Sequence, residues 1–188
     1  MSIKQKDLQI VGFGGSGSKI INALKDINAN YDCLVISADK KDIEDSKADK
    51  KIFLEEANGY GFGLDTNSAQ IVFDKNKERI LKELDLTKKQ ILISGLGGAC
   101  SSIGISYVAN MLAELKINFS MIASLPFQFE GKTRTRIAVN TLNTLLSMEQ
   151  KLYFVNNDEC SLPKNITLGE SFNLSNEMFI LEIKKCNF

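Results

Sequence analysis

Two glycine-rich segments contain the residues best suited to bind phosphate. They are Gly12–Ser18, which reads GFGGSGS, and Ser94–Ser102, which reads SGLGGACSS. Each follows a short apolar run and precedes a segment with helical spacing. Glycine lets the backbone turn tightly and approach a ligand closely. A helix that begins at such a turn adds unpaired N–H groups and the positive end of its dipole. Two loops of this kind can therefore hold a polyphosphate from two sides.

The first glycine segment alone has a second interpretation. Gly12, Gly14 and Gly17 fit the fingerprint of a dinucleotide-binding turn, and Asp39 follows about 20 residues later, where a ribose-binding acid is expected. An NAD-binding Rossmann oxidoreductase is therefore one alternative. That fold needs only one glycine loop, so it leaves the second segment unexplained.

A third glycine-rich segment, Gly59–Gly63, lies between the first two and reads GYGFG. It fits a loop that closes over a terminal phosphate, and it fits equally well a plain surface loop. Glu130 and Arg134 lie four residues apart in a later segment, PFQFEGKTR. A carboxylate can accept hydrogen bonds from both ribose hydroxyls, and an arginine can reach a phosphate or the sugar.

Near the end of the chain, Asn157, Phe172 and Glu177 are candidates for binding a base. A carboxylate accepts from N1–H and the exocyclic amine of guanine, an amide serves the other edge, and adenine presents the wrong donors. For Glu177 alone, a solvated helix face is the simpler interpretation.

The elements that position these residues alternate along the chain. Short apolar runs predict strands, and the longer segments between them have helical spacing. This alternation predicts an α/β fold with a mostly parallel, Rossmann-like sheet and helices on both faces, with ligands at the carboxyl ends of the strands. The charge-dense segment 39–51 is interpreted as a solvated connection. The expected strands are 8–11, 33–36, 52–54, 91–94, 119–123 and 152–155, and the expected helices are 18–27, 67–84, 102–115, 133–148 and 168–185.

Composition narrows the function classes. The 188 residues carry 23 basic and 23 acidic side chains, so no global field favours nucleic acid. No apolar run has the ~20 residues of a membrane span. The absence of histidine argues against histidine-based hydrolysis and against common zinc sites. Widely spaced cysteines indicate reduced thiols and a cytoplasmic protein; they are Cys33, Cys100, Cys160 and Cys186.

Taken in order, seven segments resemble the successive nucleotide loops of the FtsZ/tubulin family: GFGGSGS, ISADK, GYGFG, SGLGGACSS, PFQFEGKTR, NND and ESFNLSNE. PFQFEGKTR is the most specific of them. The resemblance covers nearly the whole chain and implies the amino-terminal GTP-binding domain of that family. It also implies that GTP or GDP binds, with Mg²⁺ held mainly through the phosphates and water.

The resemblance also implies a role for each site residue. The first and second loops would hold the α- and β-phosphates, the third would lie towards the γ-phosphate, and later residues would hold the ribose and the base. The implied nucleotide-binding residues are Gly14, Gly15 and Gly17 (first loop), Asp39 (in ISADK), Gly61 and Gly63 (third loop), Gly97 and Gly98 (second loop), Glu130 and Arg134 (ribose region), Phe172 (base), and Asn157 and Glu177 (base edge).

The second loop departs from the family pattern GGGTGTG. Each glycine that the segment has lost, as at Ala99 and Ile103, brings a side chain into space that phosphates need, and Cys100 replaces the family's threonine hydroxyl with a weaker donor. Lys19 stands where FtsZ usually carries asparagine. A second alternative is therefore a pseudo-nucleotide interaction module that has lost GTP binding.

The sequence ends at Phe188, just past the last expected helix. In the family a carboxyl-terminal domain follows and supplies an acidic activating loop. We therefore expect residues 1–188 to form one FtsZ-like nucleotide-binding domain without the activation domain, and to be a poor GTPase alone. Its expected partners are FtsZ-like filament subunits or further copies of itself.

Overall fold

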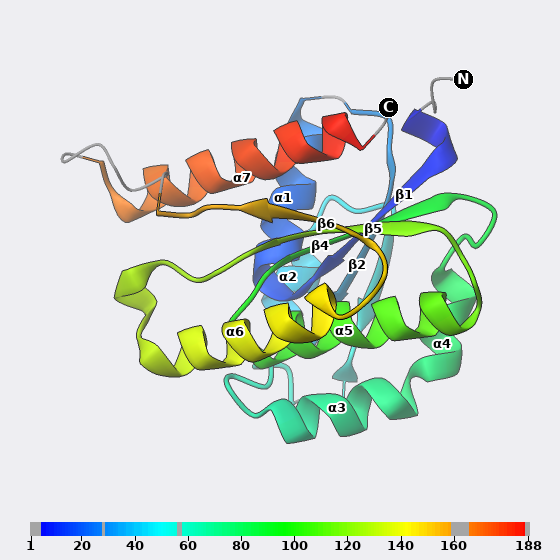
Figure 1. Cartoon of the computed structure of the whole chain (residues 1–188), viewed down its shortest axis with the longest axis horizontal. Helices are drawn as coiled ribbons and strands as arrows, with labels where there is room; N and C mark the ends of the chain where they lie inside the picture. Colours follow the sequence, from blue (N-terminus) through cyan, green and yellow to red (C-terminus); the bar gives the residue numbers. More distant parts are fainter. Residues whose placement is uncertain (1–4, 28, 56–57, 159–165, 187–188) are drawn as a thin grey trace.

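Six strands form one parallel sheet in the order β3-β2-β1-β4-β5-β6 (Figure 1). The computed structural model describes residues 5–27, 29–55, 58–158 and 166–186. All six strands expected from the sequence are present, with ends that differ by at most two residues, and the predicted fold class is confirmed. The strands are β1 (Leu8–Phe13), β2 (Asp32–Ser37), β3 (Lys50–Phe53), β4 (Lys89–Gly95), β5 (Phe119–Ser124) and β6 (Lys151–Val155).

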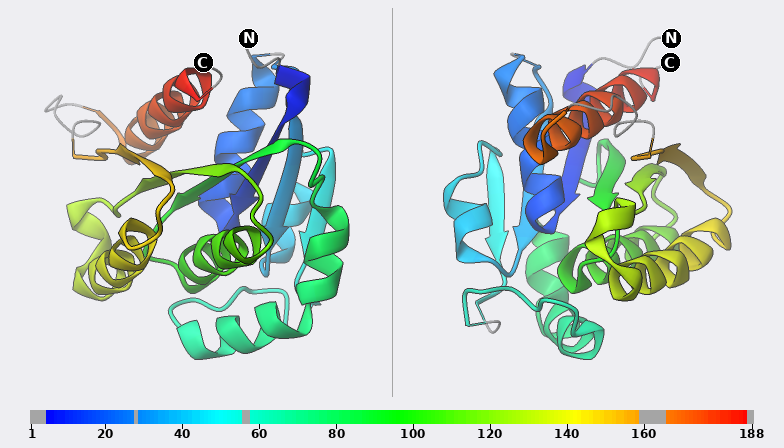
Figure 2. Two further views of the ribbon diagram at one scale, coloured as in Figure 1. Left: turned by 45° about the vertical axis from the view of Figure 1, so that its right-hand side comes forward. Right: turned by 90° about the vertical axis from the view of Figure 1, so that its left-hand side faces the viewer.

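Helices cover both faces of the sheet (Figures 1 and 2). One face carries α1 (Gly14–Asp26), α2 (Lys40–Glu44) and α7 (Leu168–Lys185). The other face carries α3 (Thr66–Lys75), α4 (Lys77–Glu83), α5 (Ala99–Glu114) and α6 (Lys132–Leu146). Every residue of β1 and β5 is buried. Continuous apolar runs are typical of parallel strands that are covered on both faces.

The largest differences from the sequence prediction lie at the helix starts. The helix expected at residue 18 begins at Gly14, and the helix expected at residue 102 begins at Ala99. Most of the first glycine segment, and the last four residues of the second, therefore belong to the first turns of helices rather than to a loop before them. Glycine lowers helix propensity, which is why the periodicity of the side chains misplaced both starts.

Two further predictions were wrong: one expected helix is divided in two, and one segment expected to be a connection contains a helix. The segment expected as one helix over 67–84 is divided into α3 and α4 at Asn76, whose amide donates to the Val72 carbonyl at 2.9 Å. Asparagine competes with the helical backbone in this way. The charged segment 39–51 contains α2, which Asp39 caps by accepting a hydrogen bond from the Lys41 N–H at 2.8 Å.

The strand order reverses between β1 and β4, and α1 begins at this point. Gly12 at the end of β1 lies directly against Gly17 in α1, so closely that neither position has room for a Cβ. Ser16 ties the same helix turn to β4, since its Oγ accepts from the Gly95 N–H at 3.0 Å. In open parallel sheets, ligands bind in the crevice at such a reversal.

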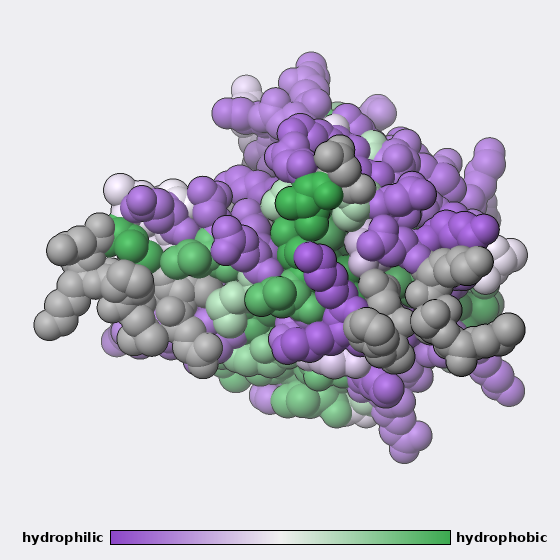
Figure 3. All heavy atoms as spheres, turned by 90° about the horizontal axis from the view of Figure 1, so that it is seen from above, coloured by the Kyte–Doolittle hydropathy of each residue, from purple (hydrophilic) through white to green (hydrophobic). Residues whose placement is uncertain are grey.

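Cys33, Cys100 and Cys186 are free thiols, and Cys160 lies outside the described residues. Within the described part of the chain, no helix combines the length and apolar character needed to cross a membrane. Apolar side chains nevertheless remain exposed along α7, among them Leu168, Leu174 and Leu181. The view from above shows apolar patches within a largely hydrophilic surface (Figure 3).

Gly17→Ala is expected to lower the free energy of unfolding by ~1–3 kcal/mol, the usual range for overpacking. A Cβ on Gly17 would lie 2.6 Å from the carbonyl carbon of Gly12, and two backbones cannot separate without moving α1 off the sheet. Urea denaturation measures the loss. Gly169→Ala in α7 is the control, because its nearest neighbour would be Thr167 Oγ1 at 3.9 Å. Equal stability of the two variants would contradict this packing account.

Candidate functional site

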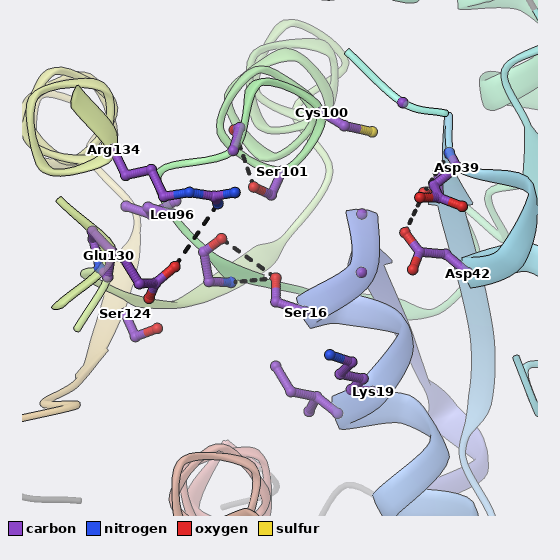
Figure 4. Close-up of a pocket in the computed structure, with 18 of the residues that line it drawn as sticks. Ser16, Lys19, Asp39, Asp42, Leu96, Cys100, Ser101, Ser124, Glu130 and Arg134 are labelled. Atoms are coloured by element: carbon purple, nitrogen blue, oxygen red, sulfur yellow. Dashed lines mark hydrogen bonds and ion pairs between the residues drawn. The ribbon is translucent and has the colours of Figure 1, made fainter. Parts of the chain in front are cut away.

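A cavity of about 400 Å³ lies at the carboxyl ends of the strands, beside the start of α1. This volume falls within the ~300–1,000 Å³ typical of ligand pockets. Its walls come from the segments that follow all six strands, together with one side of α7 (Figure 4). Segments far apart in the sequence therefore meet at one edge of the sheet, as the parallel topology requires.

Two helices begin at this cavity without a side-chain cap. Neither Phe13, which precedes α1, nor Gly98, which precedes α5, has a side chain that accepts a hydrogen bond from the first turn. In contrast, Asp65 caps α3 and Thr167 caps α7. The first turn of a helix carries N–H groups with no partner in the helix. Two uncapped N-termini that open into one cavity are suited to bind an anion with several charged oxygens.

The second glycine segment uses part of its hydrogen-bonding capacity internally. The Gly97 N–H donates to Ser102 Oγ at 2.9 Å, and Gly97 adopts a φ of 113°, which favours glycine. The Ala99 N–H donates to the Gly63 carbonyl at 3.0 Å, so the third glycine segment is docked onto the start of α5. Cys100 and Ser101, in the next positions of α5, line the cavity.

Arg134 and Glu130 lie on the wall formed after β5 (Figure 4). Arg134 Nη1 is 3.8 Å from Glu130 Oε2, and Glu130 Oε1 accepts from the Phe127 N–H at 2.9 Å. The carboxylate is therefore oriented by a backbone donor, while the arginine remains exposed to the cavity. This pair supplies one acceptor and one cation for a polar ligand.

Asp42 contributes a carboxylate to the opposite wall. It accepts a hydrogen bond from Ser37 Oγ at 2.8 Å, and a Cβ added to Gly15 would lie 3.0 Å from its Oδ1. Burial raises the pKa of Asp42 above its ordinary value of 3.8, and the Ser37 hydroxyl opposes this shift only in part. A negative charge beside the first turn of α1 opposes anion binding there, unless a proton or a cation neutralises it.

Cys100 also reaches the cavity. Burial raises the pKa of its thiol to about 12. The side chain is therefore neutral at physiological pH and acts as a small apolar group with a weak donor, rather than as a nucleophilic thiolate.

The end of the cavity next to α7 is aromatic and amide-rich. Phe172 contacts Phe127 and Phe129 edge-on, with ring centroids 5.2 Å and 6.4 Å away. Lys19 Nζ lies 5.6 Å from the Phe172 ring centroid. This distance places the lysine cation over the face of the ring, where a cation–π interaction holds it.

The Asn157 amide is fixed by the protein itself. Its Nδ2 donates to the Leu125 carbonyl at 2.7 Å and to Ser124 Oγ at 3.3 Å, while its Oδ1 accepts from Ser175 Oγ at 2.7 Å. Asn157 therefore joins β5, β6 and α7, and this structural role was not expected from the sequence.

Most of the site residues expected from the sequence line this one cavity. Gly17, Gly97 and Glu177 do not: Gly17 packs against β1, the Gly97 N–H is used by Ser102, and Glu177 is exposed on α7. The expected residues that the structure brings together are Gly14, Gly15, Asp39, Gly61, Gly63, Gly98, Glu130, Arg134, Asn157 and Phe172.

Sequence reasoning missed Asp42 and Asn176, which both line the cavity. Asn176 lies four residues after Phe172, and residues with this spacing share one face of a helix. That spacing was available in the sequence and would have favoured Asn176 over Glu177. No comparable signal marked Asp42, because the segment that contains it was interpreted as a solvated connection.

Residues 7–161 match the model of the Tubulin/FtsZ family, GTPase domain. The chain belongs to the tubulin/FtsZ family. The FtsZ/tubulin resemblance inferred from the sequence motifs is therefore confirmed. The curated cell division protein FtsZ of Coxiella burnetii is 26% identical over 184 residues, which cover 95% of this chain and 48% of that protein. The chain thus spans about half the length of the curated relatives it matches.

Solved structures of this tubulin/FtsZ family share the fold. An empty FtsZ dimer from M. jannaschii superposes with a TM-score of 0.87 at 25% identity, covering 98% of this chain and 55% of that one. CetZ2 from Haloferax volcanii, a protofilament with GTPγS bound, gives a TM-score of 0.84 at 21% identity, covering 96% of this chain and 57% of that one. At the lower identity, the likeness shows the fold alone.

Asp42→Asn is expected to raise the free energy of unfolding at neutral pH. Because burial raises the pKa of Asp42, the folded state binds the proton more tightly than the unfolded state, and the wild type loses stability as the pH rises above 3.8. The asparagine has no such loss, and its carbonyl can still accept from Ser37.

Denaturation of both proteins from pH 3 to pH 8 measures this difference, which should vanish towards the acid end. Glu44→Gln removes the same charge from an exposed position of α2 and controls for net charge. A variant that is less stable than the wild type at pH 7 would contradict the assigned cause.

Proposed function

We propose that this chain is an FtsZ-like guanine-nucleotide-binding protein that acts in or on cytoskeletal filaments and hydrolyses GTP slowly by itself. The observation that carries the proposal is the convergence of two uncapped helix N-termini on one cavity. These N-termini would hold the α- and β-phosphates, with Mg²⁺ bound mainly by phosphate oxygens and water. Arg134 and Glu130 would hold the ribose region, and Phe172 would lie against the base.

Slow hydrolysis is proposed because the carboxylates of the cavity are already engaged. Among the described residues, those that line it are Asp39, Asp42 and Glu130. Asp39 caps α2, Asp42 accepts from Ser37, and Glu130 accepts from the Phe127 N–H. A general base must lie within hydrogen-bond reach of the attacking water. Each of these three carboxylates is instead oriented by a donor of the protein itself, which disfavours its movement toward a water beside the phosphates.

Assembly with FtsZ-like subunits or with further copies of this chain is proposed on two grounds. The family match is to proteins whose solved relatives include an FtsZ dimer and a CetZ2 protofilament. The chain itself exposes Leu168, Leu174 and Leu181 along α7. Exposed apolar groups that gather on one element favour a protein contact.

A second candidate function is an interaction module that no longer binds nucleotide. Asp42 favours it, because its carboxylate lies against the turn of α1 that would receive a phosphate. Ile103 offers no support, since it packs against the hydrophobic core and does not line the cavity. The two candidates differ in whether guanine nucleotides stabilise the folded chain.

Thermal melting with and without Mg²⁺–GDP or Mg²⁺–GTP tests the nucleotide-binding proposal. A ligand at one hundred times its dissociation constant adds about 2.7 kcal/mol to the stability of the folded state. For a chain of this size, that corresponds to a rise in Tm of about 5–10 °C. No shift at millimolar GDP and GTP would reject nucleotide binding and favour the interaction module, whereas stabilisation by NAD alone would favour the oxidoreductase alternative.

A comparison of two arginine variants tests whether GDP binds in the cavity. Arg134→Ala is expected to weaken GDP binding about 10- to 150-fold, because a hydrogen bond to a charged group is worth ~1.5–3 kcal/mol. Arg136→Ala removes the same charge two residues away, at an exposed position that does not line the cavity. Equal effects of the two substitutions in calorimetric titration would mean that GDP binds elsewhere.

A further inference from the structure

The charged side chains of the cavity are divided between two of its walls. Among the described residues, its cations are Lys19 and Arg134, and its carboxylates are Asp39, Asp42 and Glu130. Arg134 Nη1 faces the Glu130 carboxylate at 3.8 Å, and Lys19 lies over an aromatic ring of α7. Asp39 and Asp42 lie on the other side of the start of α1 (Figure 4). The wall formed after β2 is therefore the acidic wall of the cavity.

The Asp42 carboxylate lies directly beside the first turn of α1. A Cβ added to Gly15 would be 3.0 Å from Asp42 Oδ1 and 3.2 Å from Oδ2. Ser37 Oγ donates to Oδ2 at 2.8 Å and holds the carboxylate in this position. A phosphate bound to the N–H groups of this turn would therefore lie next to a fixed negative charge, and two like charges repel strongly in a partly buried site.

The third glycine segment is attached to the same acidic wall. The Gly61 N–H donates to the Ala38 carbonyl at 3.1 Å. This segment is the one expected to lie towards the γ-phosphate. With the ribose beside Arg134, as in the proposed function, the phosphates extend from that wall past the start of α1 towards Asp42. The terminal phosphate is then the part of the ligand nearest to the acidic wall.

The groups around Asp42 do not offset its charge. Burial is the main cause of its raised pKa; Asp39 and Asp45, at the two ends of α2, raise this pKa as well, while Lys19 lowers it. The Cys100 thiol on α5 is neutral, because burial raises its pKa to about 12. A further negative charge at this wall is therefore unfavourable unless a proton or a cation accompanies it.

We propose that Asp42 makes the site selective for the nucleoside diphosphate over the triphosphate, because its carboxylate repels the terminal phosphate of the triphosphate. The inference rests on the proposed function, since it specifies the phosphate length that the nucleotide site prefers. The N–H groups of α1 and α5 would hold the α- and β-phosphates of both nucleotides, so the carboxylate acts mainly on the difference between them. The chain would then retain the diphosphate even where the triphosphate is the more abundant nucleotide.

Calorimetric titrations of the whole chain with GDP and with GTP in EDTA test the inference. No metal then offsets the charges or supports hydrolysis. The wild type should bind GDP at least about tenfold more tightly than GTP, which corresponds to 1.4 kcal/mol. Asp42→Asn removes the charge and keeps an acceptor for Ser37, and should bring the two affinities to within about threefold of each other. Asp42→Ala should do the same, because the charge and not the hydrogen bond is responsible.

Glu44→Gln is the matched control, since it removes one negative charge from an exposed position of the same helix outside the cavity. It should leave the wild-type preference unchanged. Equal wild-type affinities for GDP and GTP overturn the inference, as does a preference for GDP that persists in Asp42→Asn or is lost in Glu44→Gln. The proposed function survives each of these results.

If neither nucleotide binds in EDTA, the same titrations with Mg²⁺ are judged by the same criteria. If neither nucleotide binds with Mg²⁺ either, the proposed function fails, and the inference fails with it.

Discussion

The contact between Gly12 and Gly17 is the constraint on which the rest of the site depends. It lets α1 start immediately after β1, at the point where the strand order reverses. With any side chain at either position, the helix would have to move away from the sheet, and its N-terminus would leave the cavity. Ser16 then fixes this turn against Gly95 at the end of β4. One backbone contact thus sets the position of the anion-binding groups of α1.

The cavity combines features that favour and oppose a nucleotide. The two helix N-termini, Arg134 and Lys19 favour negatively charged groups. Asp42 opposes them, and Ala99 gives the start of α5 a side chain where the family pattern has glycine. A divalent cation that accompanies the phosphates would reduce the repulsion by Asp42, because a bound cation reverses the local electrostatic balance. Binding that depends strongly on Mg²⁺ is consistent with this arrangement.

The sequence was sufficient to predict the sheet and the edge at which the site lies, because buried parallel strands are continuous apolar runs and glycine segments follow two of them. It did not locate the helix starts, since Gly14–Gly17 and Ala99–Ser102 carry no apolar periodicity. Roles that depend on tertiary contacts were also missed. Asn157 is held by two other elements, and Asp42 reaches the cavity through the short helix α2.

The most direct test is whether the backbone N–H groups at the starts of α1 and α5 contact the phosphates of a bound nucleotide. Amide chemical shifts of ¹⁵N-labelled protein, recorded as Mg²⁺–GDP is added, report each of these groups separately. The largest changes are expected at Gly14, Gly15, Cys100 and Ser101, with saturation at a common GDP concentration. Unchanged signals at these four amides, while signals elsewhere move, would contradict the claim that the two helix starts hold the phosphates.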